Sequence, residues 1–190
     1  MRIISGTLRG KSLAVIHGKD IRPTSDKIRG AIFSALQSRM GSFEGLIVLD
    51  LFAGSGALSI EALSRGADFA VLVDSSSASR QLASKNLAAC SLTPKTQVVA
   101  GNALSTVQKV LPKAPFDLVF IDPPYGKSLA VKALEKLSSS ELLSKGARVV
   151  VETGKGEPLS TQYGSLELEQ SRIYGNTQIH YYVFEPGGGI

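Results

Sequence analysis

The sequence predicts an α/β protein built on a doubly wound, mostly parallel sheet. Short apolar runs alternate with amphipathic stretches from residue 46 to 152, which is the order of strands and helices in such a fold. The run at 46–49 is apolar throughout, as in a parallel strand buried on both faces. A turn containing Gly54 and Gly56 separates that strand from helical spacing at 57–63, so the backbone can approach a ligand there.

The first 40 residues are expected to form a β-hairpin and a helix. Strand-like runs at 2–4 and 13–16 flank a turn at 5–7. Thr24 or Ser25 can cap a helix that runs to about Met40. An apolar stripe at helical spacing should dock this helix on the body of the protein. The stripe consists of Ile28, Ala31, Ile32, Ala35 and Leu36.

Seven strands are expected in the main sheet. After the strand at 46–50, parallel strands are expected at 69–73, 97–100, 116–121 and 147–152. Helical stretches are expected at 75–92, 104–111, 128–137 and 140–143. The runs at 166–173 and 177–184 are joined by Tyr174-Gly175-Asn176, which predicts a closing antiparallel hairpin. We expect a basic N-terminal extension at 1–22, one domain at 23–186 and a flexible tail at 187–190.

The composition limits which classes of protein this chain can belong to. With 190 residues, the chain suits one α/β domain. The single cysteine, Cys90, excludes an internal disulfide, and the two histidines lack metal-ligand spacing, so no metal is expected. Apolar runs are too short to cross a bilayer and no signal-peptide core is evident, which predicts a cytoplasmic protein.

The positive charge is concentrated at one end of the chain. Residues 1–40 contain eight Lys or Arg and two Asp or Glu, whereas the remaining 150 residues contain 13 and 14. A basic segment on a neutral body indicates a polyanionic partner, and an ordinary solvated arm is the alternative. The candidate phosphate contacts are Arg2, Arg9, Lys11, Arg22, Lys27 and Arg29. Of these, Lys27 and Arg29 should lie off the apolar stripe of their helix or at its edge.

Polar residues follow the first four parallel strands: Asp50, Asp74, Asn102 and Asp122. They should meet at one edge of the sheet. An acid at position 74 can bind two ribose hydroxyls, and Asn102 can hydrogen-bond an adenine edge. Acids here suit a cationic ligand better than a phosphate, which favours S-adenosylmethionine over NAD. The third glycine of a dinucleotide fingerprint is also absent. Simple strand-end caps are the alternative.

The sequence Asp122-Pro123-Pro124-Tyr125 is the more specific signal. Two prolines fix the backbone and remove two N–H donors, so the carbonyls of Asp122 and Pro123 can act as acceptors. An exocyclic amine of a nucleobase is a poor nucleophile, and acceptors for its two hydrogens favour the pyramidal geometry of attack. Tyr125 can stack on the extruded base, which contributes roughly 1–3 kcal/mol.

Together these residues resemble the Rossmann-like class I S-adenosylmethionine-dependent methyltransferases that modify exocyclic amines. The closer resemblance is to the RsmD family of bacterial 16S ribosomal RNA guanine-N2 methyltransferases. It rests on RIISGTLRGK, RPTSDKIRGAIFSAL, DLFAGSGALSIEALSRGA, FIDPPY and IYGNTQIHYY, and it spans residues 1 to about 185. The glycine loop and Asp-Pro-Pro-Tyr are shared with many methyltransferases, whereas the two N-terminal segments are more particular.

The resemblance implies a methyl transfer from S-adenosylmethionine to the N2 of guanine 966 in 16S rRNA. The partner would be the small ribosomal subunit or its assembly intermediate, bound by a monomer. Residues 122–125 would receive the guanine. The implied cofactor contacts are Asp50, Phe52, Ala53, Gly54, Gly56, Asp74, Ser75, Asn102, Ala103 and Asp122. The chain departs from the family pattern at Gly30, Asp74 and Asn102, where Glu, Glu and Asp are common.

Three other functions compete with this interpretation. DNA adenine-N6 methylation uses the same tetrapeptide, but such enzymes usually carry a separate target-recognition domain. A non-catalytic rRNA-binding assembly protein would explain the basic segment but not the strand-end residues. A nicotinamide dehydrogenase is disfavoured by the missing third glycine and by the lack of an evident hydride-transfer acid.

Overall fold

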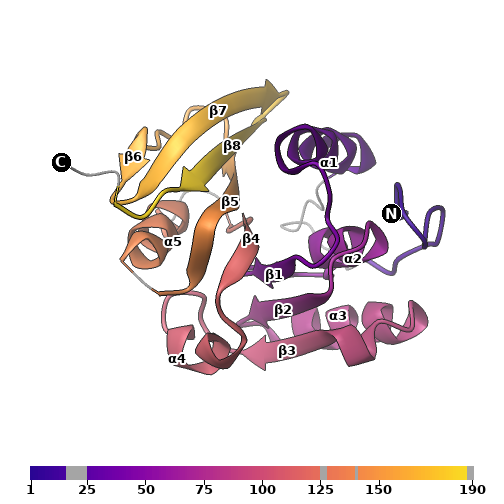
Figure 1. Cartoon of the computed structure of the whole chain (residues 1–190). Helices are drawn as coiled ribbons and strands as arrows, with labels where there is room; N and C mark the ends of the chain where they lie inside the picture. Colours follow the sequence, from indigo (N-terminus) through magenta and orange to yellow (C-terminus); the bar gives the residue numbers. More distant parts are fainter. Residues whose placement is uncertain (16–24, 125–127, 140, 188–190) are drawn as a thin grey trace.

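A computed structural model describes residues 1–15, 25–124, 128–139 and 141–187. Its described strands form one sheet in the order β3-β2-β1-β4-β5-β8-β7-β6 (Figure 1). The strands are β1 (Ile47–Asp50), β2 (Phe69–Asp74), β3 (Thr96–Ala100), β4 (Phe116–Ile121), β5 (Leu143–Gly154), β6 (Gln162–Tyr163), β7 (Leu166–Tyr174) and β8 (Thr177–Phe184). The helices are α1 (Asp26–Met40), α2 (Ala57–Ser64), α3 (Ser77–Ala89), η1 (Thr93–Lys95), α4 (Val107–Val110), η2 (Leu111–Lys113) and α5 (Leu129–Ser138).

The doubly wound arrangement is confirmed. Strands β1 to β5 are parallel, and β8, β7 and β6 follow as antiparallel neighbours. The chain winds outward from β1 through β2 to β3 and then returns to β4 on the other side of β1. Ligands bind at such a reversal of strand order, so the gap between the ends of β1 and β4 is the expected site.

Two strand predictions are corrected. The sheet has eight described strands rather than seven, because Gln162 and Tyr163 pair with the start of β7. A two-residue strand is too short to show a pattern in the sequence. The helix expected at 140–143 is also wrong where the structure describes it. Leu143 already pairs with Phe116, and the Phe116 amide donates to the carbonyl of Leu142, so pairing extends β5 backward.

Helices cover both faces of the sheet (Figure 1). One apolar cluster lies under α1, α2 and α3 and includes Val48, Leu72 and Phe120 of the sheet. The other lies under α4 and α5 and includes Leu49 and Val151. Side chains alternate along each strand, so these clusters show which face every strand residue occupies.

The expected N-terminal hairpin is short: Arg2 and Ser12 form an antiparallel bridge, and backbone hydrogen bonds join Ile3 to Lys11 and Gly10, and Leu13 to Met1. Side chains of α2 satisfy further backbone groups of this segment. The amides of Ile4 and Ser5 donate to the two Glu61 carboxylate oxygens, at 2.8 and 3.0 Å. Ser64 Oγ accepts from the Leu8 amide and donates to the Ser5 carbonyl. The basic segment is therefore fixed against α2.

We predict that Glu61→Gln destabilises the fold by about 2 kcal/mol. The Glu61 side chain is 1% exposed, and a glutamine has only one acceptor oxygen for the two amides, so a buried donor is left unpaired. The measurement is the free energy of unfolding in urea. Glu135→Gln, at an exposed position on α5, is the matched control and should change stability by less than about 0.5 kcal/mol. Equal stability of the two variants would show that Glu61 does not hold the segment.

Candidate functional site

The carboxyl ends of β1, β2 and β4 bring three acids to one face of the sheet. Asp50 pairs with Leu72 of β2 and with Phe120 of β4. Asp74 and Asp122 each follow their strand's pairing residue by two positions, and two positions restore the same face. This is the face covered by α1, α2 and α3. The register of β1, β2 and β4 therefore places three of the predicted strand-end acids on the same face of the sheet.

Asp50 is a buried acid, with 1% of its side chain exposed. Its Oδ2 accepts a hydrogen bond from the Ser59 hydroxyl at 2.9 Å. Its Oδ1 has no hydrogen-bond partner among the described residues. Burial raises the pKa of Asp50 from 3.8 to about 7, and the Asp74 charge adds to the rise while the Ser59 bond opposes it. The free acceptor is suited to a donor or a cation supplied by a ligand.

The glycine loop after β1 is tied to the end of β2. The Ala53 amide donates to the Val73 carbonyl at 3.1 Å, and the Gly54 amide donates to Asp74 Oδ2 at 2.9 Å. Gly56 has φ 77°, and a Cβ there would lie 3.0 Å from a Leu72 methyl group, so this position needs glycine. Gly56 precedes α2 without a side-chain cap, which leaves the first amides of the helix to other acceptors.

Asp74 organises this loop as well as facing the site. Its Oδ1 accepts from the Ser76 amide at 2.8 Å, while its Oδ2 holds Gly54. Each oxygen keeps a second lone pair for a ligand hydroxyl. Phe52, Ala53 and Ser75, the other expected contacts, lie within the same two strand-to-helix connections.

The residues after β3 were expected to contact the adenine of the cofactor, and their geometry supports this role less directly. Asn102 is exposed, and its Oδ1 accepts from the Leu104 amide at 2.9 Å, closing a local turn. The Ala103 side chain is buried in the apolar cluster under α4 and α5, on the other side of the sheet from the three acids. An Ala103 contact with an adenine would therefore come from its backbone.

Asp122, Pro123 and Pro124 follow β4 directly. Asp122 is half-buried, Pro123 is buried and Pro124 is exposed, so this short run leads from the sheet edge to the surface. Tyr125 lies outside the described residues, as does Arg22 of the basic segment.

Four of the predicted phosphate contacts are exposed cations: Arg2, Arg9, Lys11 and Lys27. Arg29 is a correction, because its side chain is 0% exposed. It shares a helix face with Ile32, Phe33 and Leu36, so it lies within the apolar stripe rather than off it. Its guanidinium bonds Asp26 at 3.0 Å and the carbonyl of Arg2, which fastens the N-terminus to α1.

Sequence reasoning missed two residues. Glu152, near the end of β5, is a further strand-end acid whose signal was its place after the run Val149-Val150-Val151. Asn86 interrupts the buried stripe of α3. Its Nδ2 donates to the carbonyls of Ala14 and Ser55, which links the N-terminal segment to the glycine loop.

A metal-binding cluster and a membrane-spanning helix are both absent from the part of the chain that the structure describes. There is no group of three or more His, Cys, Asp or Glu arranged to hold a metal ion. Among the same residues, no helix has both the length and the apolar character needed to cross a bilayer.

Known proteins share both the sequence and the fold. Residues 1–183 match the model of a family described as Conserved hypothetical protein 95. Ribosomal RNA small subunit methyltransferase D of Escherichia coli (strain K12) is 33% identical over 188 residues, 99% of this chain and 92% of that protein. The protein of that name from Haemophilus influenzae is 34% identical over 163 residues, 85% and 82% of the two chains. A solved structure called "Putative methyltransferase yhhF from Escherichia coli" has a TM-score of 0.82 and 33% identity, covering 97% and 98%.

Asp50 should make stability fall as pH rises. Its folded pKa of about 7 lies above the unfolded value of 3.8, so its protonated form stabilises the fold fully below about pH 4, and this contribution is lost by about pH 7. We therefore predict that Asp50→Asn flattens the decline in unfolding free energy between pH 5 and pH 8. At pH 8 the variant should be more stable than the wild type by about 1–3 kcal/mol.

Urea unfolding of both proteins at the two pH values checks this prediction. Other titrating groups act equally in both proteins and cancel in the comparison. Parallel pH dependence in the variant and the wild type would contradict the raised pKa.

Proposed function

The chain belongs to the family described as Conserved hypothetical protein 95, the RsmD family, and we propose that it methylates RNA of the small ribosomal subunit. In the proposed reaction S-adenosylmethionine gives a methyl group to the N2 of a guanine, and guanine 966 of 16S rRNA is the proposed target. The observation that carries the proposal is the placing of Asp50, Asp74 and Asp122 on one face beside the glycine loop.

The residues at this edge fit S-adenosylmethionine. The Oδ1 of Asp50, which has no hydrogen-bond partner among the described residues, can accept from the methionine ammonium. The spare lone pairs of Asp74 can accept from the ribose hydroxyls. The positive φ angles of Gly54 and Gly56 shape the loop that would bring the ligand beside the start of α2. When bound, the cofactor supplies an electrophilic methyl group on a sulfonium sulfur. Its positive charge suits an edge lined by carboxylates.

Asp122 and the proline carbonyls would orient the guanine amine. The amine has two hydrogens, and the acceptors at 122–123 favour the geometry in which its lone pair faces the methyl group. Bound S-adenosylmethionine would supply the methyl group for the new N2–carbon bond and would leave as S-adenosylhomocysteine. The proton of the new secondary amine leaves to Asp122 or to water. No strong base is required, because the amine becomes acidic only as the new bond forms.

The exposed cations of the N-terminal segment would hold the RNA. Arg2, Arg9 and Lys11 lie on residues 1–15, which α2 holds in place through Glu61. Cations on a fixed segment can position a phosphate backbone relative to the site without reading its sequence. We extend this role to the whole basic extension at 1–22, with the methyltransferase domain at 23–186 and a short tail after it.

The test measures methyl transfer from labelled S-adenosylmethionine to small ribosomal subunits from a strain that lacks this protein. The wild-type protein should label the subunits, and mass spectrometry should find N2-methylguanine at one position. Duplex DNA should remain unlabelled. Labelled adenine in DNA would instead support the N6-adenine alternative. Unlabelled RNA together with no cofactor binding would support a non-catalytic assembly protein.

We predict that Asp122→Ala lowers the methylation rate by at least about 100-fold, since it removes an acceptor that positions the reacting amine. Cofactor affinity, measured by calorimetry, should change by only a few-fold. Asp68→Asn is the matched control, because Asp68 is an exposed acid just before the start of β2, at the opposite end of that strand from Asp74. A normal rate in Asp122→Ala would remove this residue from the proposed centre.

A further inference from the structure

The β7–β8 hairpin extends past the end of β4 at the edge of the sheet where the site lies. Ile121, the last residue of β4, pairs with Val151 of β5. Strand β5 continues to Gly154 and stays paired with β8 as far as Thr177. This continuation adds about 10 Å beyond β4, at roughly 3.3 Å per residue. The turn at 175–176, which joins β7 to β8, therefore stands farther out than the carboxyl end of β4.

The end of this hairpin exposes two cations and a large apolar side chain. We define the hairpin tip as Lys155, Arg172, Ile173 and Asn176, all of which are exposed. The Lys155 amide donates to the Asn176 carbonyl at 2.9 Å, which fixes the loop after β5 to the turn. Ile173 is 56% exposed and is the one exposed large apolar side chain in the described part of the chain. Within that part neither cation forms an ion pair, so the tip offers positive charge beside an apolar contact.

Charge changes sign along β7. The first part of the strand, 166–169, contains two acids, and Glu169 lies 3.4 Å from a guanidinium nitrogen of both Arg39 and Arg148. From 170 to 184 the chain contains no Asp or Glu. Charge of either sign would keep an edge strand from pairing with another molecule, so that purpose does not require acids and cations to be separated. The separation places positive charge toward the site and indicates an anionic partner at the hairpin tip.

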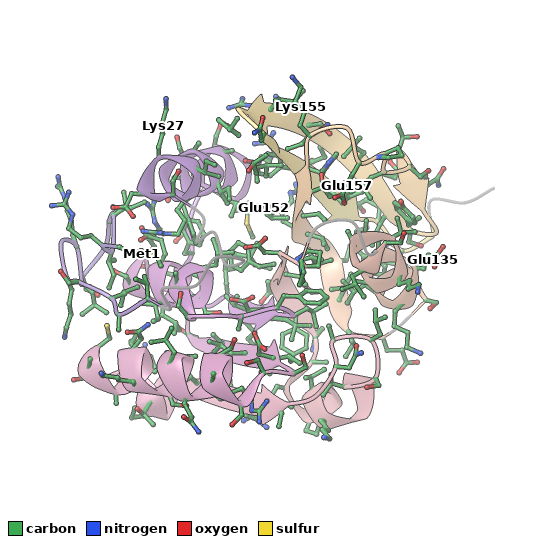
Figure 2. All side chains as sticks on the ribbon, turned by 180° about the vertical axis from the view of Figure 1, so that it is seen from behind. Met1, Lys27, Glu135, Glu152, Lys155 and Glu157 are labelled. Carbon is green, nitrogen blue, oxygen red and sulfur yellow. The ribbon has the colours of Figure 1, made fainter. Side chains whose placement is uncertain are left out.

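The hairpin tip and the N-terminal segment flank the site from two sides. The N-terminal segment is held on α2, whereas the hairpin follows β5 on the other side of β4 in the sheet. In Figure 1 the N-terminus lies beside α2 and the hairpin lies beyond β5, with α1 between them. Figure 2 shows the exposed Lys27 of α1 and Lys155 along the same border of the molecule. Positive charge therefore continues from the N-terminal segment across α1 to the hairpin tip.

We propose that the hairpin tip is a second contact surface for the RNA strand that carries the target guanine. Arg172 and Lys155 would meet phosphates, and Ile173 would pack on the face of an unstacked nucleotide next to the target. This assignment rests on the proposed methylation of small-subunit RNA. A strand held on both sides of an extruded base cannot slide past residues 122–124 while the base is in place. Apolar contact with a base face needs an unstacked base, so the partner is a single-stranded or loop segment rather than a continuous duplex.

The experiment measures binding to 16S rRNA extracted from a strain that lacks this protein, over a series of salt concentrations. The combined substitutions Arg172→Gln and Lys155→Gln should raise Kd at least about tenfold at low salt. They should also lower the slope of log Kd against log salt by about 1.4, which corresponds to two phosphate contacts on a single strand. Ile173→Ser should raise Kd about threefold or more and leave the slope unchanged, because it removes an apolar contact and no charge.

A matched pair of substitutions removes the same charge elsewhere. Lys95→Gln and Lys136→Gln alter exposed lysines, one directly before β3 and one in the last turn of α5. This control pair should change Kd by less than about twofold, because exposed charges far from the RNA are screened by salt. Cofactor affinity, measured by calorimetry, should stay within about twofold in every variant, which shows that the fold is intact.

Three outcomes would overturn the proposal. The first is a Kd and a salt slope that are the same in the hairpin pair, the control pair and the wild type. The second is self-association of the hairpin pair with unchanged RNA affinity, because the cations would then serve only to protect an edge strand. The third is weaker binding to assembled subunits without weaker binding to extracted rRNA, which would assign the tip to a protein partner.

Failure of the proposed function gives a different result. If the wild-type protein binds the RNA but forms no N2-methylguanine, the methylation proposal fails, and the hairpin variants still report whether the tip contacts RNA. If the wild-type protein forms N2-methylguanine and the hairpin pair binds RNA as the wild type does, only the role of the hairpin tip fails.

Discussion

The parallel pairing of β1 with both β2 and β4 is the constraint on which the site depends. The reversal of strand order occurs at β1, so the connections after β1 and β4 diverge and leave room at the carboxyl ends. Register then decides which side chains border that room. A shift of one residue in either pairing would turn Asp74 or Asp122 to the opposite face, under α4 and α5.

A carboxylate buried at this edge of the sheet lowers the stability of the fold. Asp50 is buried, one of its oxygens has no partner in the part of the chain that the structure describes, and its pKa is raised by burial and by the charge of Asp74. This arrangement does not stabilise the fold in the absence of a ligand, and it suits a cationic cofactor. Charged side chains stabilise the fold at the N-terminal segment. Glu61 accepts hydrogen bonds that hold this segment on α2, and Arg29 donates one that holds it on α1.

Features that depend on one strand or one turn could be predicted from the sequence. The apolar runs, the glycine turn and the strand-end acids follow from local patterns, and the parallel sheet follows from their order. Features that depend on tertiary partners could not. Arg29 occupies the apolar stripe because Asp26 and the Arg2 carbonyl receive its guanidinium, and neither contact is visible in the spacing. The contacts that hold the N-terminal segment on α2 could not be predicted for the same reason, since Glu61 lies 57 residues from Ile4, whose amide it accepts.

The central claim is that the carboxylate edge binds a cationic methyl donor through Asp50, and proton release on binding tests it most directly. At pH 6.5, below its pKa of about 7, Asp50 is mostly protonated and must ionise to accept an ammonium group. Calorimetric titration with S-adenosylmethionine in buffers of different ionisation enthalpy should therefore show release of roughly half a proton or more per site. The release should disappear in Asp50→Asn. Equal proton release in the variant and the wild type, or none in either, would contradict the claim.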